Sequence, residues 1–157
     1  MAAQLKVLAI AVATGRIAYV FMIGGELRDW GMSRKASKSP EYASKQAKSW
    51  IDRLKPDVVV TEKTDDRSRK GAKSKQLIEA IIQVTASEYL LDVAVTRIKL
   101  FKDKYIEAKA LTEQFPELNA WLPKKPRIWE PEPRNTTYFE ALSLALQVQP
   151  EAPRFIQ

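Results

Sequence analysis

Apolar residues at the start of the chain fall into short runs separated by turn residues. Residues 5–13 are apolar with almost no polar alternation, which is typical of a strand buried on both faces. After a Thr-Gly turn, residues 17–23 are rich in β-branched and aromatic side chains, and Gly24-Gly25 then indicates a hairpin. The more exposed sequence ELRDWGMS reads as a third strand. The pattern predicts three antiparallel strands as the first structural unit.

Beyond residue 39 the apolar spacing becomes that of helices alternating with short strands. A helix starts at Ser39 and Pro40, and Pro56 ends it. The later elements predicted are a strand over 57–61, a helix over 77–89, a strand over 92–98, and helices over 104–115 and 136–148. Basic residues 63–76 and the proline-rich stretch 123–135 are expected to be loops. The order predicts an α/β fold, a mixed five-stranded sheet with helices on both faces.

Length and composition fit one domain over residues 1–148, followed by a loosely ordered tail over 149–157. The sequence shows neither an apolar run long enough to span a bilayer nor a secretory leader pattern, so the cytoplasm is the expected location. It also contains neither cysteine nor histidine. Disulfides, thiolate zinc sites, cysteine nucleophiles and imidazole bases are therefore excluded, and any acid–base or metal chemistry must use Asp, Glu, Lys or Tyr.

Positive charge is concentrated in the middle of the chain. Residues 33–75 contain 13 Lys and Arg against 6 Asp and Glu, which accounts for the whole net charge of +7. Such a cluster suits a phosphate-rich partner, because each Lys or Arg placed on a phosphate releases condensed counterions. A solvated surface is the alternative interpretation. The candidate nucleic-acid contacts are Lys63, Arg67, Arg69, Lys70, Lys73 and Lys75.

Four short motifs carry a resemblance to a known family. They are Ile10–Tyr19 (IAVATGRIAY), Gly24-Gly25 with Asp29-Trp30-Gly31, Pro56–Glu62 (PDVVVTE) and Tyr138–Ala145 (YFEALSLA). Their order and spacing resemble the RNase H-like superfamily, most closely its RuvC-type Holliday-junction resolvase branch, over roughly residues 5–148. In that branch the first motif has the form Ile-Asp-Pro-Gly, then four residues to Gly-Tyr. Here Ile10 and Tyr19 match, while the Asp, the Pro and both glycines are replaced.

The resemblance implies an RNase H-like (RuvC-like) fold and candidate residues for phosphodiester hydrolysis. Two divalent ions about 4 Å apart activate water and stabilise the leaving oxygen, and they need hard oxygen ligands from several elements. By resemblance, Glu62 and Glu140 are the catalytic residues and the ligands of Mg²⁺ or Mn²⁺. Ala11 stands where the bridging Asp ligand is expected, and Thr137 stands where the family has a further acid or histidine.

Each candidate also has a plainer interpretation. Glu62 also fits a surface residue at a strand end, and Glu140 also fits a solvent-facing residue of an amphipathic helix. Asp65 and Asp66 could supply the missing ligand but are better explained as offsetting the charge of their basic loop. The four tryptophans are interpreted as packing residues rather than base-stacking platforms; they are Trp30, Trp50, Trp121 and Trp129.

Three functions remain open, and the absence of the first-strand Asp decides which of them is favoured. The first is a protein that binds DNA (branched or duplex) or RNA, with the fold kept and an incomplete, inactive metal centre. The second is a divalent-metal-dependent, structure-selective endonuclease of the Holliday-junction resolvase type using Glu62 and Glu140. The third is a non-catalytic assembly subunit whose basic face binds an acidic protein. Loss of a bridging ligand weakens both ions, so binding is favoured, and the resemblance implies a homodimer.

Overall fold

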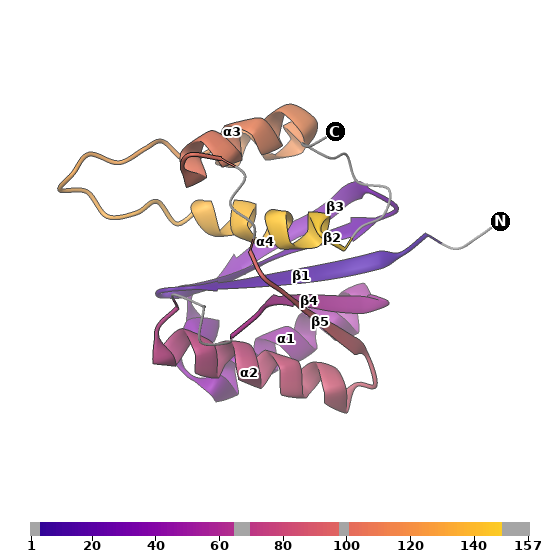
Figure 1. Ribbon diagram of the computed structural model, residues 1–157. Helices are drawn as coiled ribbons and strands as arrows, with labels where there is room; N and C mark the ends of the chain where they lie inside the picture. The colour runs from indigo at the N-terminus through magenta and orange to yellow at the C-terminus, as the bar shows by residue number, and fades with distance from the viewer. Residues whose placement is uncertain (1–3, 65–69, 98–100, 149–157) are drawn as a thin grey trace.

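The computed structural model describes residues 4–64, 70–97 and 101–148, which form a mixed sheet with helices on both faces (Figure 1). The strands are β1 (Lys6–Ala13), β2 (Arg16–Ile23), β3 (Glu26–Ser33), β4 (Val58–Glu62) and β5 (Leu91–Val95). The helices are α1 (Pro40–Leu54), α2 (Ala72–Ser87), α3 (Lys104–Gln114) and α4 (Thr136–Leu146), with 3₁₀ helices η1 (Lys35–Lys38) and η2 (Pro116–Trp121). The predicted fold class is confirmed. None of the described helices is long and apolar enough to cross a membrane.

Strand β1 is the centre of the sheet, whose order is β3-β2-β1-β4-β5. It pairs antiparallel with β2 and parallel with β4, and β4 pairs parallel with β5. Parallel strands end on the same side of a sheet, so β1, β4 and β5 place their last residues together, at what we call the carboxyl edge. The register pairs Ala9 with Val60, and extending it by two residues brings Ala11 level with Glu62.

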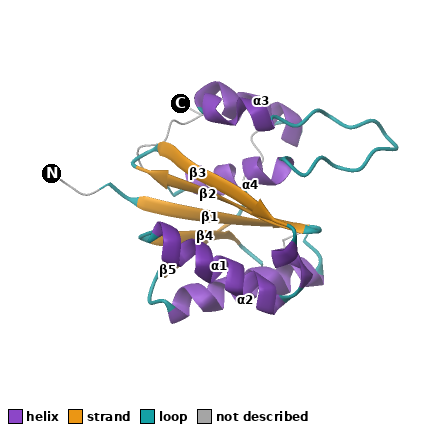
Figure 2. Cartoon of the chain, turned by 180° about the vertical axis from the view of Figure 1, so that it is seen from behind, coloured by secondary structure: helices purple, strands orange, loops and turns teal. Residues whose placement is uncertain are grey.

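The sheet separates two hydrophobic cores, because alternate residues of each strand face opposite sides. Ala9, Ala11 and Val60 face the layer of α3 and α4. Leu8 and Ile10 face the layer of α1 and α2, which lies on the opposite side in both views (Figures 1 and 2). Burial on both faces explains why β1 is apolar throughout instead of alternating.

Helix α2 begins earlier than predicted, at Ala72 instead of Leu77. Gly71 precedes it in an extended conformation, and the residues that follow are good helix formers. Lys73 and Lys75 are therefore helical, and the prediction of one loop over 63–76 is wrong in its last part. The first residues of α2 are mostly polar and show no apolar periodicity, so the sequence pattern did not indicate that its first turn is helical.

The tryptophans divide into buried and exposed positions. Trp50 is buried against Tyr19, with ring centroids 4.6 Å apart. Trp30 packs edge-on against Trp121, with ring centroids 5.1 Å apart. Trp129 is 75% exposed, so its interpretation as a packing residue is wrong.

The partly buried carboxyl group of Asp92 on β5 makes stability depend on pH. Burial raises its pKa from 3.8 to about 6, although the Thr61 hydroxyl donates hydrogen bonds to it at 3.2 and 3.3 Å. The folded protein thus holds this proton more tightly than the unfolded chain, and this contribution to stability should fall as pH rises from 3.8 to about 6.

We therefore expect Asp92→Asn to be more stable than the wild type above pH 6 and to lack this part of the pH dependence. Urea unfolding at a series of pH values measures both. Parallel pH profiles for the two proteins over this range would contradict the assignment.

Candidate functional site

Glu62 ends β4 at the carboxyl edge, and its side chain is only 15% exposed. It points toward the α3–α4 layer because Val60, two residues earlier, belongs to that core. Burial raises the pKa of Glu62; the positive charge of Lys70 opposes this rise, and the negative charge of Glu140 adds to it. Glu62 is therefore not a plain surface residue.

Glu140 lies on α4, which packs over β1 and β2. The residue is 8% exposed, so its interpretation as a solvent-facing glutamate is wrong. Its Oε2 atom is buried, and none of the described residues forms a hydrogen bond with that atom. Glu140 and Glu62 are near enough to repel each other, so the structure brings together the two carboxylates that the sequence paired.

Lys70 lies between the end of β1 and Glu62. Its Nζ atom donates a hydrogen bond of 2.6 Å to the carbonyl oxygen of Val12 and lies 3.9 Å from Oε1 of Glu62. Ala11 itself is buried and offers only a methyl group. An ammonium ion from the chain therefore lies where β1 ends, next to the first carboxylate.

A second ion pair completes this group of charges. Arg97 follows β5 at the carboxyl edge and donates a hydrogen bond of 2.7 Å to Oε1 of Glu107 on α3. Burial raises the pKa of Glu107, the charge of Arg97 opposes this, and Glu140 adds to the rise. We call Glu62, Glu107 and Glu140 the acidic centre. Sequence reasoning missed Glu107 and Arg97, because neither belongs to a motif and their contact joins two elements.

Thr137 stands where the resemblance implies a further metal ligand, but its contacts are of a different kind. The residue is fully buried, and its hydroxyl accepts a hydrogen bond of 2.6 Å from Nε of Arg16. The same guanidinium donates to the Thr136 hydroxyl at 3.2 Å and pairs with Glu132 at 3.2 Å. Here the position that would carry an acid or histidine anchors a buried cation instead.

The three carboxylates of the acidic centre do not converge into a metal site among the described residues. A pair of divalent metal ions needs three or four carboxylates that converge on it. Across the described ranges 4–64, 70–97 and 101–148, no group of three or more acidic side chains could hold a metal ion. Ala11 supplies no ligand atom, and the positive charges of Lys70 and Arg97 already act on Glu62. A metal ion bound to Glu62 would lie close to the positive charge of Lys70.

A basic pocket of about 570 Å³ borders the same edge. Its lining residues are Gly15, Arg34, Lys35, Ser37, Lys38 and Lys73. Gly15 lies in the turn after β1, and Lys73 lies in the first turn of α2. These described lining residues include four cations and no acid, so the pocket is suited to a phosphate group. Sequence reasoning counted Arg34, Lys35 and Lys38 in the charge excess but did not place them in a site.

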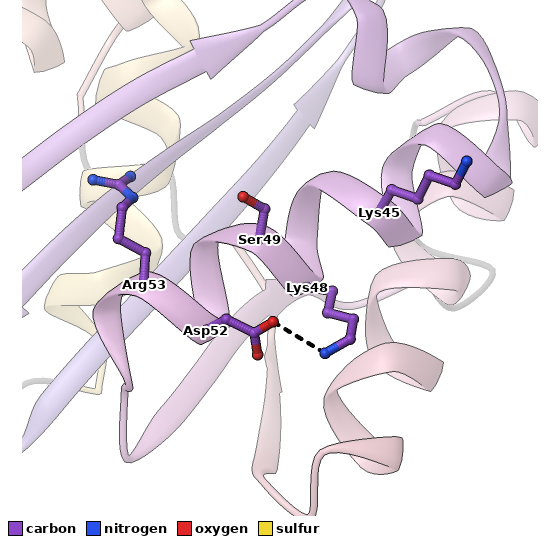
Figure 3. Close-up of a pocket in the computed structure, with 5 residues that line it drawn as sticks. All are labelled: Lys45, Lys48, Ser49, Asp52 and Arg53. Atoms are coloured by element: carbon purple, nitrogen blue, oxygen red, sulfur yellow. Dashed lines mark hydrogen bonds and ion pairs between the residues drawn. The ribbon is translucent and has the colours of Figure 1, made fainter.

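A second pocket, on α1, has a more balanced charge (Figure 3). Its lining residues are Lys45, Lys48, Ser49, Asp52 and Arg53. Lys48 pairs with Asp52 at 3.0 Å and with Glu88 at 2.7 Å, and Arg53 pairs with Asp29 at 3.1 Å. Because acids already offset Lys48 and Arg53, this pocket is a weaker candidate for phosphate binding.

The predicted nucleic-acid contacts fall into three groups. Lys63 and Lys73 are exposed near the carboxyl edge, whereas Lys70 and Lys75 are half-buried. Arg67 and Arg69 lie outside the described residues, as do Asp65 and Asp66. The roles assigned to these residues, and to Glu62 and Glu140 as catalytic groups, stay predictions.

Comparison with solved structures finds the same fold in Holliday-junction resolvases. The chain is 14% identical to RuvC of Thermus thermophilus, with a TM-score of 0.57 over 90% of this chain and 92% of that one. It is 14% identical to the fowlpox virus resolvase bound to Holliday-junction DNA, with a TM-score of 0.61 over 92% and 97% of the chains. The yeast mitochondrial resolvase Ydc2 is 13% identical, with a TM-score of 0.51 over 90% of this chain and 76% of that one. At such identities the likeness establishes a RuvC-like resolvase fold.

No protein-family model matches the chain, and no curated protein matches its sequence. Residue roles therefore depend on the geometry of this chain.

Removing the charge of Glu140 should stabilise the protein if Lys70 and Arg97, and no metal ion, offset the negative charge of the acidic centre. Glu140→Gln keeps the shape of the side chain and removes the repulsion with Glu62 and Glu107. We expect the free energy of unfolding to rise by about 1 kcal/mol, equally in EDTA and in Mg²⁺. Thermal and urea unfolding measure this.

Glu113→Gln, an exposed residue on α3, is the matched control and should change little. A wild type stabilised by Mg²⁺, with that gain abolished in Glu140→Gln, would show instead that the centre binds metal.

Proposed function

We propose that this protein binds branched DNA at the carboxyl edge of its sheet without cleaving it by two-metal chemistry. The observation that carries the proposal is the position of Lys70, whose ammonium lies 3.9 Å from Oε1 of Glu62 and donates to the Val12 carbonyl at the end of β1. A cation of the chain thus balances the carboxylate that the resemblance assigns to a metal ion. The acidic centre is, in this proposal, an incomplete metal centre.

The solved structures support the choice of branched DNA. RuvC of Thermus thermophilus and the fowlpox virus resolvase, which share this fold, have both been solved in complex with a Holliday junction. The same edge in this chain carries the basic pocket and the exposed side chain of Lys63. Contacts of this kind position a nucleic acid by its phosphates and carry no base sequence directly. The proposal therefore predicts recognition of DNA shape.

Arg16 and Lys70 have a structural role in this proposal. Arg16 ties the start of β2 to the start of α4 through the hydroxyls of Thr136 and Thr137. Lys70 ties the segment before α2 to the end of β1. Both interactions hold the carboxyl edge in one shape, which lowers the cost of ordering it when DNA binds. The proposal includes a homodimer, because two copies related by a two-fold axis suit a two-fold junction.

A divalent-metal-dependent endonuclease is the second candidate. It is favoured by the Oε2 atom of Glu140, a buried oxygen for which the described chain provides no hydrogen bond. In that alternative Glu140 and Glu62 hold Mg²⁺ or Mn²⁺ after Lys70 moves away. The two candidates differ in one outcome, which is cleavage.

The wild type should bind a four-way DNA junction and leave it uncut. We expect a shifted band in a native gel whose intensity falls steeply with salt, since the protein is held by phosphates. In Mg²⁺ or Mn²⁺ a denaturing gel should show only full-length strands. Divalent-dependent cutting that disappears in Glu62→Gln would overturn the proposal. Failure to bind any DNA or RNA at low salt would favour a scaffold that binds an acidic protein.

Charge variants locate the bound DNA in the same assay. Replacing Arg34, Lys35 and Lys38 together with glutamine should weaken junction binding at every sequence. The slope of log affinity against log salt should shrink by about 0.9 for each phosphate that the variant no longer neutralises. Lys45→Gln, in the pocket on α1, is the matched control and should leave the slope unchanged.

A further inference from the structure

The loop over residues 122–135 carries two exposed apolar side chains at its tip. Arg127–Glu130 form a turn in which the Glu130 N–H donates to the Arg127 carbonyl at 2.9 Å. The Arg127 N–H donates in turn to Oε1 of Glu130 at 3.0 Å. Ile128 and Trp129 occupy the two central positions of this turn, Ile128 fully exposed and Trp129 75% exposed. A formed turn thus holds both side chains in solvent.

The loop is stiffened along its length and tied at both ends. Its four prolines, which restrict the backbone, are Pro123, Pro126, Pro131 and Pro133. On one side Lys125 pairs with Asp103 at 3.5 Å. On the other side Glu132 pairs with Arg16 at 3.2 Å and also with Lys104. The tip is therefore presented in a fixed position, which lowers the entropic cost of binding a partner.

The loop projects on the side where DNA is proposed to bind. Both views show it extending from the body at the end of the molecule where β1 terminates (Figures 1 and 2). The basic pocket borders that same end, because its Gly15 lies in the turn after β1. A nucleic acid at the carboxyl edge would therefore lie beside both features.

The chemistry of the tip fits a nucleobase. A base offers a flat apolar face that stacks on an aromatic ring, and the phosphates beside it attract cations. Trp129 supplies the ring, with the guanidinium of Arg127 5.6 Å from its centroid. Further positive charge along the loop comes from Lys124, Lys125 and Arg134. An acidic protein would match these charges but would not require an exposed indole.

We propose that Ile128 and Trp129 stack on an unpaired or splayed base at the branch point of the bound DNA. This inference rests on the proposed function and adds the feature that distinguishes branched DNA from linear duplex. Bases within a duplex are already stacked on their neighbours, so the tip gains a partner only where stacking is interrupted. The basic pocket supplies general affinity, and the tip supplies preference for structure.

The test compares wild type and Trp129→Ala on two DNAs of the same sequence, a four-way junction and a linear duplex. Each carries 2-aminopurine, with the junction labelled at the crossover. We expect Trp129→Ala to reduce affinity for the junction by about 10- to 100-fold and affinity for the duplex only slightly. The change in 2-aminopurine emission seen with the wild type should disappear. Trp129→Phe keeps an aromatic face, so it should retain part of the junction affinity and part of the change in 2-aminopurine emission.

Tyr89→Ala is the matched control. Tyr89 is 97% exposed and lies between α2 and β5, at the opposite end of the parallel strands. It should leave junction preference unchanged.

Three outcomes would overturn this inference alone. The first is an equal decrease of affinity for junction and duplex in Trp129→Ala, and the second is no decrease for either. The third is a wild type that sediments as a dimer and a Trp129→Ala variant that sediments as a monomer but keeps its preference for the junction. The tip would then bind a second copy of the chain. A wild type that binds neither DNA would overturn the proposed function along with this inference. Wild-type binding with unchanged preference in Trp129→Ala would overturn only the inference.

Discussion

The structure of the site depends on the contacts that the Lys70 ammonium group makes with β1 and β4. This ammonium group donates to the last part of β1 at the Val12 carbonyl and lies 3.9 Å from the carboxylate that ends β4. Burying like charges is unfavourable without nearby opposite charge, and the acidic centre holds three carboxylates. Lys70 and Arg97 supply that opposite charge from within the chain. These two side chains thus offset part of the negative charge of the acidic centre.

The same edge of the sheet organises the binding features. Parallel pairing of β1, β4 and β5 puts the acidic centre, the basic pocket and the base of the projecting loop at one end of the molecule. The cations of the pocket on α1 are partly offset by acids, whereas those lining the basic pocket have no acid among them. Local charge balance therefore separates two surfaces that the overall charge of +7 does not distinguish.

The sequence predicted most of the fold because burial leaves a pattern. The uninterrupted apolar run of β1 and the cap at Ser39 both correspond to observed elements. Resemblance paired Glu62 with Glu140, and tertiary packing does bring them close. The bond from Arg16 to Thr137 could not be predicted, because it joins residues far apart in sequence that share no motif. Exposure of Trp129 was also missed, because aromatic residues are usually buried and only the path of the loop shows otherwise.

Diffraction from crystals soaked in Mn²⁺ tests the central claim most directly. Manganese scatters anomalously, so an ion bound at the acidic centre would appear as a distinct peak. We predict no peak between Glu62 and Glu140, with the Lys70 ammonium still close to Glu62. A Mn²⁺ ion coordinated by both carboxylates, with Lys70 displaced, would contradict this prediction.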